Sequence, residues 1–551
     1  MKNFGRYWIA ASLLAGAAVG AGAQSADAPA LPVVRVASGA SQLLVSGHPY
    51  LMLGGELGNS SAGTAAQADT ILPRLAGLHF NTVLMPVAWD EIEPQEGRFD
   101  FSVLDHWVDV AQEQHVHLVL LWFGSWKNAF SNYAPEWVLT DTRRFPRAIS
   151  AEGLPTEILS PLGAETARCD ARAFAALMRH VREKDAAQQT VLMVQVENEI
   201  GYLGVGGRDR SEAANKLFTE AVPGELMARV KSGAGFATGL NPAGRNWKEV
   251  FGGAADEDFV AWEYGLFAQQ VAAAGKKEYA LPMYMNAQLP AEKETAGDYP
   301  SGGPYPTTQA IYRAAAPAID FYAPDIYWPD FSGWVDEYAA AANPVFVPEA
   351  RLDAAPMNAM YLYGEARGFG FSPFAVDSLP AADSQGKSED KGSPQTGPGL
   401  GEVYGALGAM SDVILEAQAK GAIRGLVLHE TSLRPAQTVA LGGFLFRATL
   451  ARGWPARNLL TSDGGMMVLE TAPDEFLVMG SGLTVTFSRD PDADGQVAGI
   501  AGIERLAHVD GKWTPVEVEN GDQSDQGRGL LMDAKAFGVY RVRLYTYSRK
   551  N

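Results

Sequence analysis

Eight short apolar runs, separated by longer amphipathic stretches, constrain the fold of this chain more than any other feature. The runs lie at residues 50–56, 81–89, 116–123, 190–198, 281–287, 319–327, 344–350 and 368–374. Apolar strands joined by helical crossovers are typical of a parallel sheet whose outer face is covered by helices. Eight such units predict an α/β fold of the (β/α)8 TIM-barrel class over residues 49–421. A doubly wound open sheet is the alternative, and the count of eight argues against it.

The hydrophobic pattern changes at residue 422. Beyond it, segments such as "FLFRATL", "LTVTFSRD" and "VYRVRLYTY" alternate apolar with polar residues, and Gly, Asp and Pro turns separate them. A period of two predicts half-buried β-strands. We therefore expect a C-terminal β-rich domain at residues 422–551. Residues 24–48 form an N-terminal extension with room for a strand or two.

Residues 1–23 have the pattern of an export signal. Lys2 and Arg6 flank the start of the apolar run "WIAASLLAGAAVGA", and a small-x-small cleavage site ends at Ala23. A membrane anchor is the alternative, but this run of about 14 residues falls short of the ~20 that span a bilayer. We expect a periplasmic or secreted protein. Because Cys169 is the only cysteine, no intramolecular disulfide can form there.

The charge balance narrows the class of partner. The chain has 44 basic and 64 acidic residues, and its net charge is −20. Binding to nucleic acid needs a surplus of Lys and Arg, and so does binding to an anionic membrane surface. We therefore expect neither nucleic-acid binding nor membrane insertion, whereas a neutral ligand fits. The sequence does not indicate an oligomeric state.

Polar and aromatic residues lie where the apolar runs stop. They are Glu56, Trp89, Asp90, Trp122, Asn198, Glu199, Asn286, Tyr327 and Glu349. In a (β/α)8 barrel the carboxyl ends of the strands and the following loops form the active site. Ordinary turn polarity is the alternative, above all for Asp90 and Asn286. It explains Glu349 less well, since burying a carboxylate without a function incurs a desolvation penalty.

Two carboxylates on facing strands predict glycoside hydrolysis, which needs one carboxylate and one carboxylic acid. Glu349 is one candidate, and "VENEIG" supplies the other. Glu197 and Glu199 have the same strand parity, so that we expect them on the same side, with Glu197 about 6.6 Å deeper. This depth favours Glu199 for the chemistry and makes Glu197 a buried partner of a neighbouring polar group.

Tryptophans near the strand ends are candidates for stacking on sugar rings. They are Trp89, Trp122, Trp126 and Trp328. Packing at the barrel rim is the alternative, since large aromatic side chains commonly have a structural role. Two long segments, residues 202–261 and 378–399, emerge on the same face of the barrel. Whether they form a lid is left open by the sequence.

Several of these motifs resemble glycoside hydrolase family 35, the β-galactosidases. "QVENEIG" is similar to the family's Q-[IV]-E-N-E-Y-G signature, and "MPVAWDEIEPQEGRFDF" to its strand-two block. "APEWV" resembles the P-x-W-L after strand three, and "PMYMNAQL" the strand-five block. The motifs cover most of the barrel in the family's order. The resemblance is to a divergent bacterial branch with a β-rich C-terminal domain, and some members of that branch act on the galactosyl side chains of plant xyloglucan.

The resemblance implies a retaining exo-β-galactosidase. It implies that Glu199 is the acid/base, that Glu349 is the nucleophile, and that Asn198 and Asn286 contact sugar hydroxyls. The full set of expected substrate-binding residues is Glu56, Trp89, Trp122, Asn128, Asn198, Asn286 and Tyr327. Asn128 stands where the family's strand-three block carries a glutamate, and Ile200 stands where it carries a tyrosine.

We accordingly expect an enzyme that hydrolyses terminal β-D-galactosyl residues of an oligosaccharide or polysaccharide. The alternatives are a β-glucosidase, an endo-glycanase and a non-catalytic carbohydrate-binding protein. No cofactor or metal is implied. His115 and His117 form the closest histidine pair, but they lie at the start of a strand, on the face of the barrel opposite the site.

Overall fold

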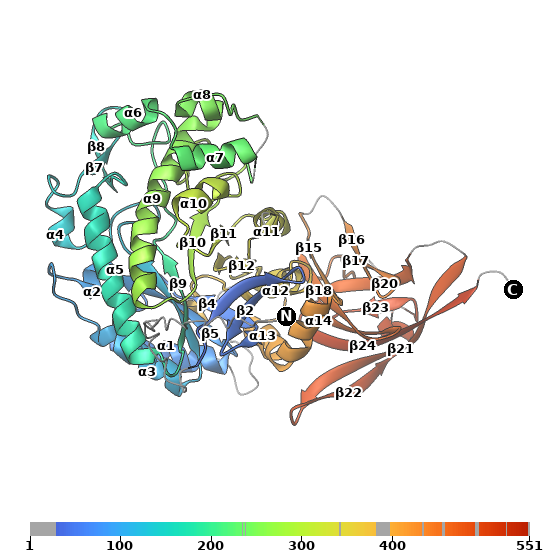
Figure 1. The fold of residues 1–551 in the computed structure, drawn as a ribbon. Coiled ribbons are helices and arrows are strands. Elements are labelled where there is room, and N and C mark those ends of the chain that lie inside the picture. Colours follow the sequence, from blue (N-terminus) through green and yellow to red (C-terminus); the bar gives the residue numbers. More distant parts are fainter. Residues whose placement is uncertain are drawn as a thin grey trace, which may run out of the picture.

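The computed structural model describes residues 29–548, except residues 234, 237–238, 341–342, 382–396, 432–434, 454–457, 491–494 and 525. The expected export signal and most of the 378–399 segment lie outside the described residues. Figure 1 shows a helix-covered barrel beside a β-rich C-terminal region. Among the helices that the structure describes, none combines the length and hydropathy that crossing a membrane requires.

The barrel strands form where the sequence predicts them. They are β4 (Met52–Glu56), β5 (Thr82–Ala88), β6 (His117–Phe123), β9 (Val191–Val196), β10 (Met283–Gln288), β11 (Phe321–Ile326), β12 (Phe346–Val347), β13 (Glu349–Ala350) and β14 (Gly370–Phe371). All are parallel, in the order β12-β14-β4-β5-β6-β9-β10-β11-β13. The predicted (β/α)8 barrel is confirmed.

The predicted seventh strand is split in two, and the split closes the barrel. Pro348 separates β12, which pairs with β14, from β13, which pairs with β11. Proline has no N–H to donate to a neighbouring strand, so the ladder is interrupted there. The short segment 346–350 thus joins both ends of the sheet. Glu349 lies on this seam.

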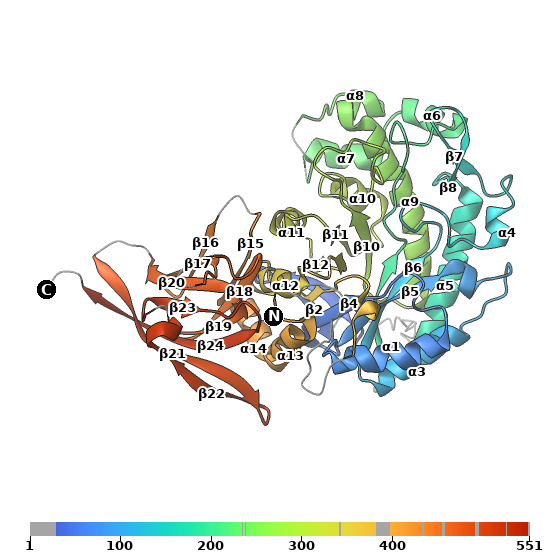
Figure 2. The ribbon, with the colours of Figure 1, turned by 180° about the vertical axis from the view of Figure 1, so that it is seen from behind.

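Helices cover the outside of the barrel (Figures 1 and 2). The main ones are α1 (Ala65–Gly77), α3 (Ser102–Glu113), α5 (Ala164–Asp185), α9 (Ala255–Glu278), α10 (Gln309–Ala315), α11 (Phe331–Ala339), α12 (Ala355–Gly364), α13 (Leu400–Ala409) and α14 (Ser411–Lys420). The last two of these helices, α13 and α14, meet at Met410. Their apolar faces pack on the outward side chains of the strands in one large core.

The N-terminal extension contains three antiparallel strands. They are β1 (Val33–Ala37), β2 (Ala40–Val45) and β3 (His48–Tyr50). Leu43 on β2 is fully buried in the cluster that fills the barrel interior, where Leu84 and Phe321 also lie. Because β3 leads directly into β4, this small sheet closes the amino-terminal end of the barrel, opposite the predicted site.

The C-terminal region has two antiparallel sheets. One contains β15 (Ile423–His429), β18 (Asp463–Ala472), β19 (Glu475–Ser481), β24 (Gly538–Ser548), β21 (Gln496–Val509) and β22 (Lys512–Glu519); the other contains β16 (Ala436–Leu441), β17 (Phe444–Leu450), β20 (Leu483–Arg489) and β23 (Gly529–Leu531). They share a separate core that includes Phe446, Phe476 and Val542. An ion pair between Arg424 on β15 and Glu365 after α12 links this region to the barrel.

We expect Leu43→Ala to lower the free energy of unfolding by about 2–5 kcal/mol, because it leaves a cavity under the barrel interior. Val36→Ala is the matched control: Val36 lies in the same small sheet but is 45% exposed, and its loss should cost much less. Urea unfolding of both variants checks this. Equal effects would show that the small sheet does not support the barrel interior.

Candidate active site

Three carboxylates converge at the carboxyl ends of the barrel strands. Glu199 follows β9, Asp325 lies in β11 and Glu349 begins β13. One oxygen atom from each lies within 4.8 Å of an oxygen of the other two. All three side chains are buried, with at most 5% of their surface exposed. The barrel therefore brings the predicted pair together and adds a third acid.

Glu199 is held by hydrogen bonds from two directions. Its backbone N–H donates to Asn286 Oδ1 at 2.9 Å, and Asn128 Nδ2 donates to Glu199 Oε2. Its backbone has φ +46°, in the left-handed region that non-glycine residues adopt at a cost of about 1–3 kcal/mol. Neighbouring contacts must therefore hold this conformation, and the Asn286 amide is one of them.

The structure corrects the expectation that Glu197 and Glu199 point to the same side. Strand β9 ends at Val196, and both glutamates have a positive φ, so strand parity does not apply to them. Glu197 Oε2 accepts the backbone N–H of Trp126 at 2.9 Å, and its other neighbour is Asp170 on α5. Glu197 therefore faces the helix layer, whereas Glu199 faces the barrel mouth.

Glu349 retains one unused oxygen. The hydroxyl of Tyr327 donates to its Oε1, and Oε2 has no hydrogen-bond partner among the described residues. A buried acceptor that lacks a partner is costly unless a ligand or a reaction uses it. This arrangement suits a carboxylate that approaches a bound substrate through Oε2.

Burial and mutual repulsion set the charges of the site. Burial, together with the nearby charge of Glu349, raises the pKa of Glu199 to about 7, although the ammonium group of Lys127 opposes the shift. The same two causes raise the pKa of Glu56 and of Asp325 well above their usual ranges. Four acids this close to one buried lysine cannot all be ionised, and burial and repulsion favour the neutral forms of Glu56 and Asp325.

Unused polar atoms surround this cluster. Asn198 Oδ1 accepts the backbone N–H of Asn128 at 3.3 Å, while its Nδ2 has no partner within the described chain. Both side-chain oxygens of Glu56 also lack a donor there, although its side chain is only 1% exposed and its carboxyl group adjoins that of Glu349. Buried polar groups are normally satisfied, so these atoms are available to the hydroxyl groups of a ligand.

The prediction that tryptophans near the strand ends stack on sugar rings is wrong for three of the four, for which the packing alternative holds. Trp89, Trp122 and Trp126 are fully buried, and their indole N–H groups donate to Glu93, Asp170 and the carbonyl of Leu159. These side chains belong to the core between strands and helices. Trp328 differs, because its ring is 40% exposed and adjoins Tyr327 of the site.

Sequence reasoning missed Asp325 and Lys127. Asp325 is the one charged residue within the run "FYAPDIY", and this exception in an apolar strand was an available signal. Lys127 lies just after β6 and is only 4% exposed. Its ammonium group also lies over the ring of Phe123, 5.1 Å from the centroid. Nothing in its local sequence pattern distinguishes it from a surface lysine.

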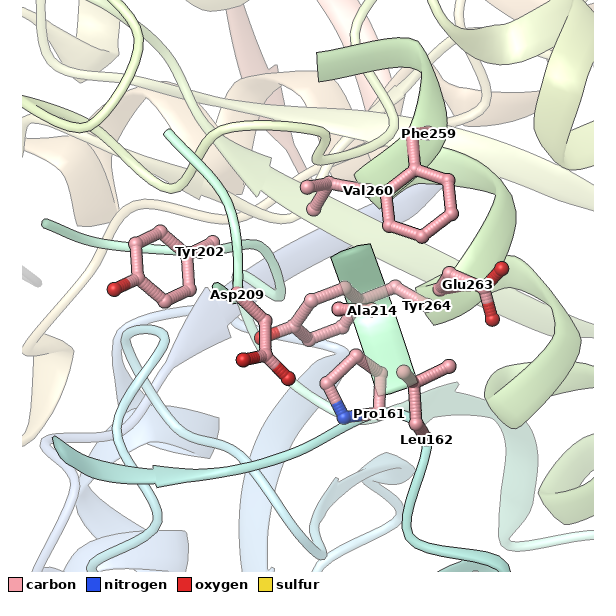
Figure 3. A pocket seen from close by; sticks show the side chains of 9 residues that line it. All are labelled: Pro161, Leu162, Tyr202, Asp209, Ala214, Phe259, Val260, Glu263 and Tyr264. Carbon is pink, nitrogen blue, oxygen red and sulfur yellow. The ribbon is translucent and has the colours of Figure 1, made fainter. Parts of the chain in front are cut away.

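The segment after β9 packs against the barrel wall. It contains α6 (Glu212–Thr219), α7 (Gly224–Ser232) and α8 (Trp247–Phe251). This segment, α9 and residues 161–162 line a small cavity of about 10 Å³, and Figure 3 shows its lining side chains, Tyr202, Asp209 and Tyr264 among them. That volume is about enough for one water molecule. A sugar ring does not fit there, so this cavity is not the substrate site.

Two family models match the chain. Residues 63–222 match the glycoside hydrolase 42 family, described as beta-galactosidase, and residues 400–531 match a domain of unknown function, DUF5597. The first match covers β5, β6, β9 and Glu199. It shows that this part of the barrel is similar to that family of glycoside hydrolases. A comparison with curated proteins gave no match.

Solved structures give remote similarities. The exo-β-1,4-mannosidase Op5Man5 from Opitutaceae bacterium strain TAV5 aligns at 14% identity and TM-score 0.42, over 70% of this chain and 63% of that one. A beta-galactosidase from the psychrophilic Marinomonas ef1 aligns at 13% and 0.36, over 54% and 48%. An endo-1,4-beta-mannanase from Rhizomucor miehei aligns at 11% and 0.41, over 62% and 89%. The chain thus spans less than two thirds of the first two.

Proposed function

We propose that this protein is a retaining exo-β-galactosidase, exported from the cell, that removes terminal β-D-galactosyl residues from oligosaccharides such as those of plant xyloglucan. The observation that carries the proposal is the buried pair of Glu199 and Glu349, with carboxylate oxygens within 4.8 Å of each other. Retaining glycosidases have carboxyl groups ~5–5.5 Å apart, and inverting ones need ~6.5–9.5 Å to admit a water. The 4.8 Å limit applies to one oxygen of each group, and such a close approach is consistent with retention.

The two acids divide the reaction into two displacements. Glu349 Oε2 attacks the anomeric carbon, and the bond from that carbon to the leaving oxygen breaks as Glu199 gives this oxygen its proton. The sugar is then an ester of Glu349. Glu199, now a carboxylate, takes a proton from water, and the hydroxide displaces Glu349 and releases the sugar. Each glutamate ends in its starting protonation state.

The choice of galactose rests on the beta-galactosidase family match over residues 63–222 and on the motifs that resemble family 35. Recognition of the sugar falls to the unused polar atoms of Glu56 and Asn198, since these face the cluster without partners. A buried donor or acceptor that only one hydroxyl configuration satisfies penalises the other epimer. The exposed ring of Trp328 is suited to the part of the substrate beyond the cleaved bond.

Aryl glycosides test the sugar assignment. We expect kcat/KM for the p-nitrophenyl β-galactoside to exceed those for the β-glucoside and β-mannoside by tenfold or more, because an unsatisfied buried polar group costs about 1–3 kcal/mol. Preference for either of the other two sugars would overturn galactose as the substrate. No turnover of any of them, with retained sugar binding, would indicate a carbohydrate-binding protein. Sugar release from xyloglucan oligosaccharides, galactan and lactose then identifies the natural linkage.

Glu349→Ala should lower kcat by at least 10⁴-fold, because no other group forms the glycosyl ester. Azide or formate should restore part of the turnover, since either anion fits the space left by the carboxylate. Asp353→Ala, at an exposed acid of the following loop, is the control and should retain activity. Normal activity in Glu349→Ala would remove this residue from the nucleophile role.

The pKa of Glu199 predicts the alkaline limb of the pH profile. Its proton is needed for cleavage and is lost above about pH 7, so kcat/KM should fall about tenfold per pH unit beyond that value. Glu199→Gln provides the control. An activated aryl leaving group departs without help from an acid. With such a substrate, kcat/KM of this variant, which reports formation of the glycosyl ester, should no longer fall at alkaline pH. An alkaline limb that persists in Glu199→Gln would assign it to another group.

A further inference from the structure

Asp325 is the acid of the cluster that the reaction above does not use. It lies in β11, and its side chain is 1% exposed. Oδ2 accepts a hydrogen bond from Asn286 Nδ2 at 2.7 Å, and Oδ1 has no partner among the described residues. A carboxylate oxygen of Asp325 lies within 4.8 Å of one of Glu199. The two carboxyl groups are placed for a direct hydrogen bond, which requires a proton on one of them because two ionised carboxylates have no donor.

The surroundings of Asp325 favour its neutral form. Acids from three other parts of the barrel face it: Glu56 from β4, Glu199 after β9 and Glu349 from β13. The nearby cation, Lys127, acts on Glu56 and Glu199. Burial, followed by the neighbouring acids Glu349, Glu199 and Glu56, raises the pKa of Asp325 well above its ordinary range. Since Oδ2 accepts from Asn286, Oδ1 is the oxygen left to carry a proton.

We propose that Asp325 is a positioning residue of the glycosidase site, which as a neutral carboxylic acid donates its Oδ1–H to the carboxylate of Glu199. The inference rests on the proposed function, because it assigns a role relative to the acid/base. Asp325 keeps its proton throughout, and the proton that reaches the leaving oxygen is that of Glu199. Asp325 acts on this glutamate and not on the substrate.

The proposed bond favours the transition state over the ground state. A hydrogen bond to an ionised acceptor is about twice as strong as one to a neutral acceptor. The bond from Asp325 therefore strengthens as Glu199 gives up its proton, and only interactions that strengthen in this way accelerate the chemical step. The same residue orients the Asn286 amide, whose oxygen holds the backbone N–H of Glu199. Asp325 thus supports both the acidity and the position of Glu199.

Two substitutions test whether Asp325 is a neutral hydrogen-bond donor or an ionised carboxylate. Asp325→Asn keeps an acceptor for Asn286 and a donor for Glu199, so the alkaline limb of kcat/KM should stay within a few tenths of a pH unit of wild type. Asp325→Leu removes the donor. Its alkaline limb should move to higher pH by about one pH unit or more, because the ionised form of Glu199 loses a stabilising hydrogen bond. The maximal kcat/KM should fall about 10²-fold.

The inference is overturned if the alkaline limb moves to lower pH or, in Asp325→Leu, does not move. If Asp325 were ionised, either substitution would remove a like charge, and the alkaline limb would move to lower pH. An unchanged limb in Asp325→Leu would show that Asp325 does not contact Glu199. If Asp325→Leu does not fold, Asp325→Asn still decides between an unmoved limb and a lowered one. Failure of the proposed function is distinguishable, because it shows in the wild-type protein, as preference for another aryl glycoside or as absence of turnover, before any Asp325 variant is compared.

Discussion

The repulsion between buried carboxylates is the constraint on which the site depends. Glu56, Asp325 and Glu349 lie in three strands and Glu199 follows a fourth, and the side chains of all four are buried at the barrel mouth. Such a cluster is stable only when protons and donor groups are shared among its members. The donors come from Tyr327, Asn128 and Asn286, one from each of three loops or strands. The other strands and helices of the barrel hold these donors and acceptors in position.

The fold was largely predictable because its signals are short-range. Apolar runs and helical periodicity gave the strands of the barrel, and period-two segments gave the C-terminal sheets. The split at Pro348 was not predicted, since proline marks a break but not the two partners of the broken strand. The separation of α13 and α14 at Met410 also lacks a strong local signal, since neither Gly nor Pro stands there.

The site was predictable in part, and the limits have a physical cause. Both faces of a barrel strand are buried, so an apolar pattern does not tell whether Trp122 faces the interior or the helices. The directions of Glu197 and Glu199 depend on a positive φ at each of them. Glutamate rarely adopts such a φ, so the sequence does not predict it. Position at a strand end was a better guide, because it brought Glu199, Asn286, Tyr327 and Glu349 into one cluster.

Because Glu349 lies on the barrel seam, the proposed chemistry depends on closure of the barrel. The segment that carries it pairs on one side with β11 and on the other, through β12, with β14 at residues 370–371. Without the strands on both sides of this segment, the sheet stays open and Glu349 has no fixed position relative to Glu199. The two acids of the proposed reaction therefore face each other only in the closed ring, so the site depends on the first and the last strands of the barrel alike.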